Sequence, residues 1–385
     1  MSSRPIVGGS NAPVGACFGG PSPEHDVSVL TGLQAARELA RSGRTVTALY
    51  WSKTGEWYEV EATSEGSAFV DGVPRGAQPL QLVTGPDGGF VSRGGRGFMS
   101  GKSKTLDLGV VVNCCHGAPG EDGTLQGAFD LAGIRYTGCG VAASALGMDK
   151  LAFYALATAG GLVTLPRALL HAGLSPGDLG FPGPYILKPR FGGSSIGVEV
   201  VADLASALDL LRVSAHLKRG AVVEPYRNDL FDLNVAVRTW PKVELSAIEK
   251  PERSTAGAEI LGYSDKYAGG EGMVSAPRQL PADISEPVSR QVREMAVKAA
   301  ASMSTRGVVR VDFLSDGQSE VYINEVNTIP GSLARHLWVD PPLPFYELLA
   351  SMIEEAEQAP TFSPSAAGAD GTVLRMAGSI AGKLG

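Results

Sequence analysis

The sequence predicts an α/β protein in which an N-terminal parallel-sheet domain precedes a longer, two-lobed α+β region. An apolar run at 14–18 leads into a glycine-rich turn, a helical pattern and a second β-like run at 45–51. A strand, a turn, a helix and a strand in this order are typical of neighbouring parallel strands. After about residue 147 the pattern changes to short strands with antiparallel alternation between amphipathic helices, which predicts the second region.

The N-terminal elements follow from the spacing of apolar residues. Residues 1–14 contain no continuous apolar stretch, so we expect a flexible arm rather than a secretory signal. Five apolar residues at helical spacing predict the first helix, namely Val27, Leu30, Leu33, Ala36 and Ala40. Residues 60–105 are rich in glycine and serine, so an irregular or hairpin excursion is expected there. A further apolar strand is predicted at 108–114, followed by a polar turn at 116–123 and a helix.

The second region is predicted to alternate helices with short strands. Helices are expected at 148–159, near 203–213 and at 286–303. Short strands are expected at 184–189, 221–224, 235–237, 243–248, 308–314 and 320–325. The last two strands flank Ser315-Asp316-Gly317, a turn-forming sequence that predicts a hairpin. The alanine-, glycine- and proline-rich residues after about 360 are expected to form a loose tail.

Composition excludes several classes of protein. The chain has 385 residues, 44% of them hydrophobic and 19% charged, which is the balance of a globular protein. Its net charge is −7 and no broad basic field is present, which argues against nucleic acid or membrane as a partner. No apolar window of membrane-spanning length is found. The cysteines are too few for a disulfide framework and are not spaced as zinc ligands, so we expect a cytoplasmic protein with reduced thiols at Cys17, Cys114, Cys115 and Cys139.

A lysine at the end of a predicted strand is the first candidate for chemistry. Lys188 is followed by Gly192-Gly193-Ser194-Ser195, a loop of glycines and hydroxyls. The backbone N–H groups of such a loop can bind phosphate oxygens while the lysine supplies a positive charge. The segment is not a Walker A loop, and a plain surface turn is the alternative reading.

Acidic side chains on two predicted strands form the second candidate. Side chains alternate along a strand, so Arg310 and Asp312 face one way, as do Glu325 and Asn327. If the strands pair, two carboxylates and an amide converge, and such hard oxygen ligands suit Mg²⁺ when substrate phosphates complete its shell. Arg310 could stabilise a developing oxyanion there. A solvated strand face with one ion pair is the alternative.

Polar residues after two N-terminal strands form the third candidate. Glu24 and His25 begin the first helix, and His116 and Glu121 follow the strand at 108–114. An acidic residue at a helix N-terminus is favourable without any function. Both turns nevertheless lie at the carboxyl ends of parallel strands, where ligands bind in such sheets.

Five stretches in this order resemble the D-alanine–D-alanine ligase family, within the ATP-grasp superfamily. They are FGGPSPEHDVS at 18–28, HGAPGEDGTLQGAFDLAGIRYTGCGVAASALGMDK at 116–150, ILKPRFGGSSIGV at 186–198, SDKY at 264–267 and RVDF…YINEVNTIPGS at 310–332. The resemblance implies a pre-ATP-grasp domain at 15–147, a central ATP-grasp lobe at 148–226 and a C-terminal lobe at 227–358. It places a lid loop at about 255–275, leaves a tail at 359–385 and implies a homodimer.

The resemblance also implies a role for each matching residue. ATP contacts are implied for Lys150, Lys188, Ser195, Glu224, Pro225, Tyr226, Asp232 and Lys266. Two Mg²⁺ ions, for which Mn²⁺ can substitute, are implied at Asp312, Glu325 and Asn327. Amino-acid contacts are implied for Glu24, Val27, His116, Gly331 and His336. Catalytic roles are implied for Glu24, Ser194, Tyr267 and Arg310.

The implied reaction joins two D-amino acids through an acyl phosphate made from ATP, most simply two molecules of D-alanine for a peptidoglycan precursor. Asp232 and His336 depart from the family, which commonly has glutamate and serine at these positions. Because that serine helps to hold the second substrate, His336 motivates an alternative: an amide ligase with another amine acceptor, in specialised metabolism. Lys266 and Tyr267 in the lid favour an amine over a hydroxy acid. A catalytically silent nucleotide-binding module is the third hypothesis, and retention of the charged set argues against it.

Overall fold

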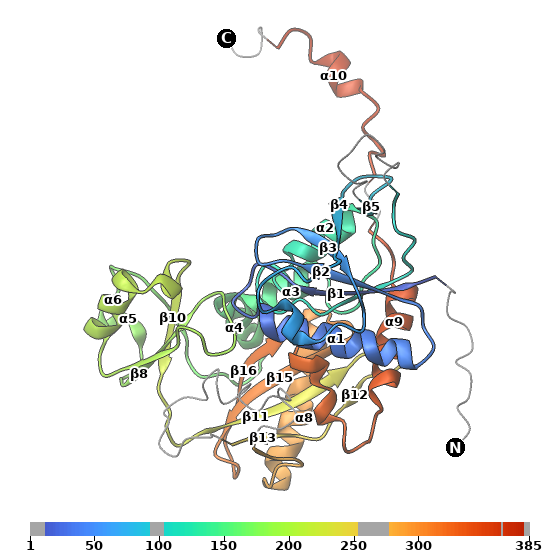
Figure 1. Ribbon diagram of the computed structural model, residues 1–385. Coiled ribbons are helices and arrows are strands. Elements are labelled where there is room, and N and C mark those ends of the chain that lie inside the picture. Colours follow the sequence, from blue (N-terminus) through green and yellow to red (C-terminus); the bar gives the residue numbers. More distant parts are fainter. Residues whose placement is uncertain (1–11, 93–103, 253–276, 363–364, 381–385) are drawn as a thin grey trace.

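Three larger sheets, a two-stranded sheet of β13 and β14, and their helices build the described part of the molecule. The computed structural model describes residues 12–92, 104–252, 277–362 and 365–380. In Figure 1 the N-terminal sheet lies against the C-terminal lobe, while the central lobe that carries β8, β10, α5 and α6 projects to one side. Residues 1–11 of the expected arm and the whole expected lid at 255–275 lie outside the described residues.

The N-terminal sheet has six strands in the order β5-β4-β3-β2-β1-β6. The predicted parallel pairing is confirmed for its first half, because β1 pairs in parallel with both β2 and β6. The prediction of a parallel sheet is wrong for the other half, where β3, β4 and β5 add antiparallel strands. The strands are β1 (Val14–Gly19), β2 (Val46–Trp51), β3 (Trp57–Val60), β4 (Gln78–Val83), β5 (Gly89–Ser92) and β6 (Val111–Asn113).

One prediction in this domain is confirmed and one boundary is corrected. The excursion at 60–105 contains the β4–β5 hairpin, as expected, and a short 3-10 helix, η1 (Gly66–Phe69). The strand expected at 108–114 is confined to Val111–Asn113. Val110, Cys114 and Cys115 are buried without belonging to β6, so their apolar character reflects the core rather than the sheet.

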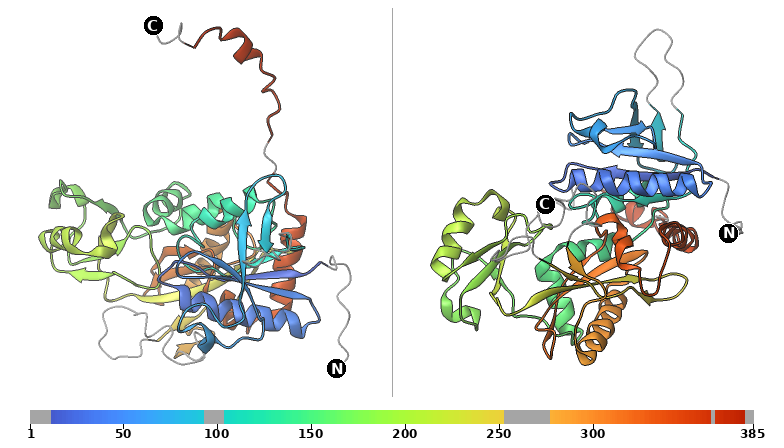
Figure 2. Two further views of the ribbon diagram at one scale, coloured as in Figure 1. Left: turned by 45° about the horizontal axis from the view of Figure 1, so that its top comes forward. Right: turned by 60° about the horizontal axis from the view of Figure 1, so that its bottom comes forward.

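Helix α1 (His25–Arg41) lies between the N-terminal sheet and the C-terminal lobe (Figure 2). Its residues share a core with Phe18 of β1 and with Leu337 and Met352 of the C-terminal lobe. Contact between α1 and β1 is close at Gly32, where an added Cβ would lie 2.3 Å from the Phe18 side chain. The remaining N-terminal helices are α2 (Thr124–Leu131) and α3 (Val141–Met148).

The helix predicted at 148–159 is two helices that meet at Asp149. Met148 ends α3, and α4 (Lys150–Ala159) begins with the Asp149 carboxylate accepting hydrogen bonds from the Leu151 and Ala152 N–H groups. A side-chain acceptor at this position satisfies N–H groups that the first helical turn leaves unpaired. The break between the helices therefore fixes the position of Lys150 as the first residue of α4.

The central lobe is a four-stranded sheet in the order β7-β10-β8-β9, antiparallel throughout. Its core includes Leu187, Ala207 and Val223, which are nearly inaccessible to solvent. Its elements are β7 (Ala168–Leu170), α5 (Pro176–Leu179), β8 (Tyr185–Pro189), β9 (Glu199–Val201), α6 (Leu204–Val213), η2 (Ala215–Leu217) and β10 (Ala221–Pro225).

The C-terminal lobe is built on a second four-stranded antiparallel sheet, β12-β11-β15-β16, against which α8 packs. The predicted hairpin after Leu314 is confirmed, since β15 and β16 pair antiparallel. The elements are β11 (Phe231–Arg238), β12 (Glu244–Leu245), β13 (Lys250–Pro251), β14 (Arg278–Gln279), α8 (Glu286–Met303), β15 (Val308–Ser315), β16 (Val321–Asn327), η4 (Gly331–Leu337) and α9 (Phe345–Gln358).

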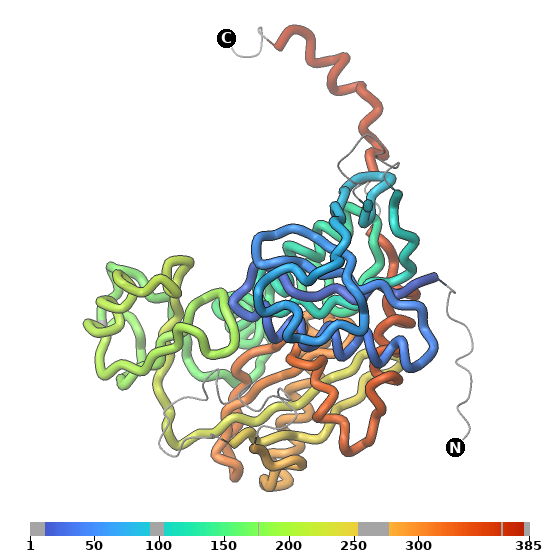
Figure 3. Tube along the Cα trace, viewed as in Figure 1, coloured from blue at the N-terminus to red at the C-terminus, as the bar shows by residue number. Residues whose placement is uncertain are grey.

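Beyond α9 the chain leaves the globular part, as the tube in Figure 3 shows. The described part of this tail contains one short helix, α10 (Thr372–Met376), whose residues are exposed. The expected loose tail therefore carries a single helical turn. Among the described residues, no helix has the length and apolar character needed to cross a membrane.

The close approach of α1 and β1 makes a testable prediction about stability. Replacing glycine by alanine in a helix normally stabilises it by up to about 1 kcal/mol, and we expect this for Gly127→Ala in α2, where the nearest atom lies 3.9 Å from the added Cβ. Gly32→Ala forces a methyl group into the Phe18 side chain, so its free energy of unfolding should fall by about 1–3 kcal/mol. Urea denaturation of both variants measures the difference. Equal stability of Gly32→Ala and the unmodified protein would contradict this packing.

Candidate active site

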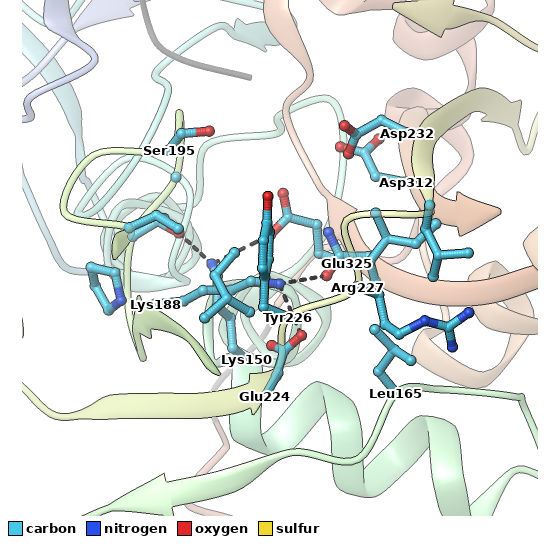
Figure 4. A pocket seen from close by; sticks show the side chains of 18 of the residues that line it. Lys150, Leu165, Lys188, Ser195, Glu224, Tyr226, Arg227, Asp232, Asp312 and Glu325 are labelled. Carbon is cyan, nitrogen blue, oxygen red and sulfur yellow. Dashed lines mark hydrogen bonds and ion pairs between the residues drawn. The ribbon is translucent and has the colours of Figure 1, made fainter. Parts of the chain in front are cut away.

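A cleft lies between the central sheet and the C-terminal sheet. Its space, including the part open to solvent, is about 960 Å³, and residues of β8, β10, β15 and β16 line it. Every described residue for which the sequence implied an ATP contact lines this cleft, namely Lys150, Lys188, Ser195, Glu224, Pro225, Tyr226 and Asp232. Lys266 lies outside the described residues. Figure 4 shows the labelled side chains around the opening.

Lys188 is held at the end of β8 by two oxygen atoms. Its Nζ donates to Glu224 Oε2 and to Asn324 Oδ1, each at 3.0 Å. Burial alone would raise the pKa of Glu224, but the positive charges of Arg167 and Lys188 outweigh it and hold that pKa below its usual value. Glu224 is therefore an ionised, buried carboxylate beneath the cleft.

Lys150 joins the glycine-rich loop to the C-terminal sheet. Its Nζ donates to the Gly192 carbonyl at 2.6 Å and lies 3.3 Å from Glu325 Oε2. Its backbone is also fixed, because the Lys150 N–H donates to the Arg190 carbonyl at 3.0 Å. Arg190 in turn makes a bidentate pair with Asp149, with N–O distances of 2.8 and 2.6 Å. These contacts bring the end of β8 and the start of α4 together.

Two serines of the loop adopt a backbone conformation that is uncommon for residues with a side chain. Ser194 and Ser195 have φ values of 53° and 59°, in the left-handed region. Such a conformation costs free energy and clusters at ligand-binding loops. The Ser194 hydroxyl donates to the Glu24 carboxylate, which connects this loop to the start of α1.

The acidic residues face each other across β15 and β16. The register pairs Asp312 with Glu325 and Arg310 with Asn327. Arg310 holds Asp312 through two contacts of 2.6 and 2.7 Å, and Asn327 Nδ2 donates to Asp312 Oδ2 at 2.9 Å. Within the described ranges no three His, Cys, Asp or Glu side chains gather closely enough to hold a metal ion. Two carboxylates and an amide fit a Mg²⁺ ion whose remaining ligands come from a bound phosphate.

A second, smaller cavity adjoins the cleft. Glu24, His116, Glu121, Arg310 and Gly331 line it. It shares five lining residues with the cleft, namely Lys150, Gly192, Gly193, Ser194 and Glu325. A group bound in the second cavity can therefore meet the end of a ligand bound in the first.

His116 is neutral and fixed in one tautomer. Its Nδ1 lies 2.7 Å from the Ile329 carbonyl, which can only accept, so Nδ1 carries the proton. Its Nε2 then accepts from the Thr31 hydroxyl at 2.8 Å, and that oxygen accepts from the Ser332 N–H at 3.1 Å. Burial lowers the pKa of His116 to about 4. Both ring nitrogens are thus engaged by protein atoms.

Glu121 connects the N-terminal domain to the C-terminal lobe at this cavity. Its carboxylate accepts from the Ile329 N–H at 2.8 Å and from the Gly117 N–H at 3.0 Å. Burial, with a further contribution from the charge of Glu24, raises its pKa to about 7. The sequence placed Glu121 at a promising turn but assigned it no role, since its backbone partner at Ile329 is distant along the chain.

Two of the implied site residues line neither cavity, and two lie outside the described residues. Tyr267, like Lys266, lies outside the described residues. Val27 is buried in α1 and lines neither cavity. His336 lines neither cavity, and its Nε2 lies 3.5 Å from Glu249 Oε1 in the interior. Two residues that contact the lysines of the cleft were not predicted: Arg167, which belongs to no quoted stretch, and Asn324, which lies in the stretch at 310–332 but was given no role.

The pKa of Glu121 predicts a pH dependence of stability. Because the pKa is higher in the folded protein than the usual 4.5, protonated Glu121 contributes stability that is fully present below pH 4.5. That contribution is lost as the pH rises through about 7. At ~1.4 kcal/mol per pKa unit, the loss is about 3 kcal/mol. Glu121→Gln should lack it, so chemical denaturation from pH 4.5 to 8 should show a steeper decline for the unmodified protein. Parallel pH profiles for the two proteins would refute the assignment.

Comparison with known proteins identifies the family. The model of the D-ala D-ala ligase N-terminus matches residues 13–139, and that of the D-ala D-ala ligase C-terminus matches residues 175–354. The D-alanine–D-alanine ligase of Synechococcus sp. (strain CC9605) is 32% identical, over 92% of this chain and 99% of that protein.

Solved structures agree with this match. The D-alanine–D-alanine ligase of Helicobacter pylori is 25% identical with a TM-score of 0.67, covering 91% of this chain and 99% of that one. The VanG D-Ala:D-Ser ligase of Enterococcus faecalis is 25% identical with a TM-score of 0.70, covering 90% and 100%. From the matched length and the identity, this chain belongs to the D-alanine–D-alanine ligase family.

Proposed function

We propose that this protein uses ATP to join two molecules of D-alanine into D-alanyl-D-alanine, for the synthesis of a peptidoglycan precursor. The family assignment supports this activity. The observation that carries it is the contact between the two cavities, which share Lys150, the glycine-rich loop and Glu325. A phosphate donor and a carboxylate acceptor need this arrangement, because the two reacting groups must lie within bonding reach.

The larger cleft is proposed to bind ATP. Lys150 and Lys188 supply positive charge to its phosphates, and the loop at 192–197 folds over them. Residues 224–226, at the end of β10, line the wall of the cleft where we place the adenine, and Asp232 accepts from the ribose hydroxyls. Tyr226 and Asp232 are both cleft residues, which supports this orientation.

Asp312, Glu325 and Asn327 are proposed to hold Mg²⁺ together with the phosphates. When bound, Mg²⁺ neutralises phosphate charge as the γ-phosphoryl group moves. The chain's own part is to keep the oxygens in place. Arg310 and Asn327 fix the Asp312 carboxylate, and Lys150 fixes that of Glu325.

The smaller cavity is proposed to bind the first D-alanine. Glu24, which Ser194 orients, attracts the ammonium group of the D-alanine. The carboxylate of the D-alanine then points toward the wall that the two cavities share. Carboxylate oxygen attacks the γ-phosphorus, ADP leaves, and an acyl phosphate forms. The ammonium of the second D-alanine first loses a proton to water, and the resulting amine attacks the acyl carbon. Phosphate leaves with the C–O bond electrons and takes up the proton that the amide nitrogen loses. Arg310 and the backbone near Gly331 stabilise the oxyanion of that step.

His336 motivated an acceptor other than D-alanine. Its nearest charged partner is Glu249, which Arg278 also contacts at 2.8 Å. Burial lowers the pKa of His336, against the opposing effect of Glu249. A side chain inside the protein does not reach an acceptor in the described cavities, so D-alanine is the acceptor that we favour.

Product analysis tests the proposal. With Mg-ATP and D-alanine the protein should form D-alanyl-D-alanine, ADP and phosphate in equal amounts, and excess chelator should stop the reaction. Mass spectrometry with D-serine, D-lactate and other amines added in turn measures the acceptor preference. Phosphate release that D-alanine does not stimulate would overturn the proposal, and a product formed only with another amine would favour the alternative ligase.

Substitution of the metal ligands gives a second test. Asp312→Asn and Glu325→Gln keep the shape of each side chain but remove the charge that Mg²⁺ requires. We expect kcat to fall by about 100-fold or more in each. Asp209→Asn is the matched control, since Asp209 is an exposed carboxylate on α6 that pairs only with its neighbour Arg212 in the described contacts. Normal turnover in Asp312→Asn or Glu325→Gln would contradict the metal assignment.

A further inference from the structure

Arg167 is a buried arginine that neither a sequence motif nor the proposed reaction uses. It lies just before β7, and its side chain is only 5% exposed. Its Nε lies 2.8 Å from Glu224 Oε1 on β10. Its Nη1 donates to the Lys150 carbonyl at 2.7 Å, and its Nη2 donates to the Asn324 carbonyl at 3.2 Å. One guanidinium therefore connects the central sheet, the start of α4 and β16.

These contacts place Arg167 directly behind the two lysines of the cleft. Glu224, which it contacts, is also the partner of Lys188. Asn324, whose carbonyl it holds, offers its side-chain oxygen to the same lysine. Arg167 does not itself line the cleft. Arg167 can therefore affect a ligand only through its charge or through its contact residues Lys150, Glu224 and Asn324, which line the cleft.

The charges of this cluster do not cancel. Arg167 and Lys188 are positive and Glu224 is negative, so the three together carry one net positive charge at the wall of the cleft. Without Arg167 the pair of Lys188 and Glu224 would be neutral. Charges in a buried site are poorly screened by solvent and salt. The loss of one positive charge should therefore strongly weaken the attraction between the site and a neighbouring polyphosphate.

Arg167 also decides how firmly Glu224 holds Lys188. A buried carboxylate without a partner is costly, so a Glu224 that depended on Lys188 alone would retain the lysine. Since Arg167 neutralises one carboxylate oxygen, the lysine ammonium can turn toward a phosphate without leaving Glu224 unpaired. The hydrogen bonds from Arg167 to the carbonyls of Lys150 and Asn324 also fix the backbone of these two residues relative to each other.

We propose that Arg167 is a positioning residue of the nucleotide site, which frees Lys188 for a phosphate group and gives the site its net positive charge. This inference rests on the proposed ATP-dependent function. It concerns the recognition of the polyphosphate rather than of the adenosine, because Arg167 contacts the carboxylate that holds Lys188 and the backbone of Lys150, the two lysines proposed to meet the phosphates.

Steady-state kinetics of three variants tests the proposal. Arg167→Gln removes the charge, and we expect its KM for ATP to rise by about tenfold or more, with the KM for D-alanine within about twofold of the original. Arg167→Lys keeps the charge and should recover most of the loss. Arg238→Gln is the control, because Arg238 is a similarly buried arginine that pairs with Glu244 and lines neither cavity. Both KM values should be unchanged in it.

Inhibition by ADP and by adenosine separates a charge effect from a merely structural one. In Arg167→Gln, inhibition by ADP should weaken while inhibition by adenosine stays as in the unmodified protein. Equal weakening of both, or a KM for ATP within twofold of the original, overturns the proposal. If Arg167→Gln does not fold, Arg167→Lys provides the test. This variant keeps the positive charge, so it should keep the preference for ADP over adenosine. Loss of that preference in Arg167→Lys would overturn the proposal.

The test is independent of the reaction itself. ADP and adenosine binding can be measured by calorimetry on the full chain without any turnover. If the unmodified protein forms no dipeptide, the proposed function fails, whereas the effect of Arg167→Gln on ADP binding still supports or overturns the role of Arg167.

Discussion

The contact between Lys150, the Gly192 carbonyl and Glu325 is the constraint on which the site depends. It joins the start of α4, the loop after β8 and the strand β16 at one point. That point is the wall shared by the two cavities. Two ligands that must exchange a phosphoryl group therefore meet where three separate parts of the chain are already fixed. The Asp149 cap and its pair with Arg190 supply the rigidity that the lysine requires.

Buried polar contacts, rather than the sheets alone, hold the N-terminal domain to the C-terminal lobe at the substrate cavity. Thr31, His116 and Glu121 reach the backbone of Ile329 and Ser332 across the interface. These hydrogen bonds form a connected buried network, so a shift of residues 329–332 relative to α1 would break several of them at once. The smaller cavity is thus formed only when both parts are assembled.

Much of the fold follows from local pattern in the sequence. Apolar spacing and turn residues correctly predicted three features, because they specify these features locally. The three are the parallel pairing of β1 with β2, helix α8 and the β15–β16 hairpin. The β4–β5 hairpin lies within the excursion where a hairpin was expected, whereas β3, which joins it to β2, was missed, since glycine-rich connections hide short strands. The pairing of Asp312 with Glu325 was predictable from alternation along two strands. The contacts of Arg167 with Glu224 and of Glu121 with Ile329 were not, because each pair is distant in sequence and no local pattern specifies it.

The central claim is that a carboxylate in the smaller cavity takes the γ-phosphoryl group from a nucleotide in the larger one. Isotope transfer tests this most directly. When D-alanine labelled with ¹⁸O in its carboxylate is converted, mass analysis of the released phosphate should find one ¹⁸O atom from the amino acid in each molecule. Unlabelled phosphate, released together with the dipeptide, would contradict the account, because the carboxylate oxygen would then never have been bonded to phosphorus.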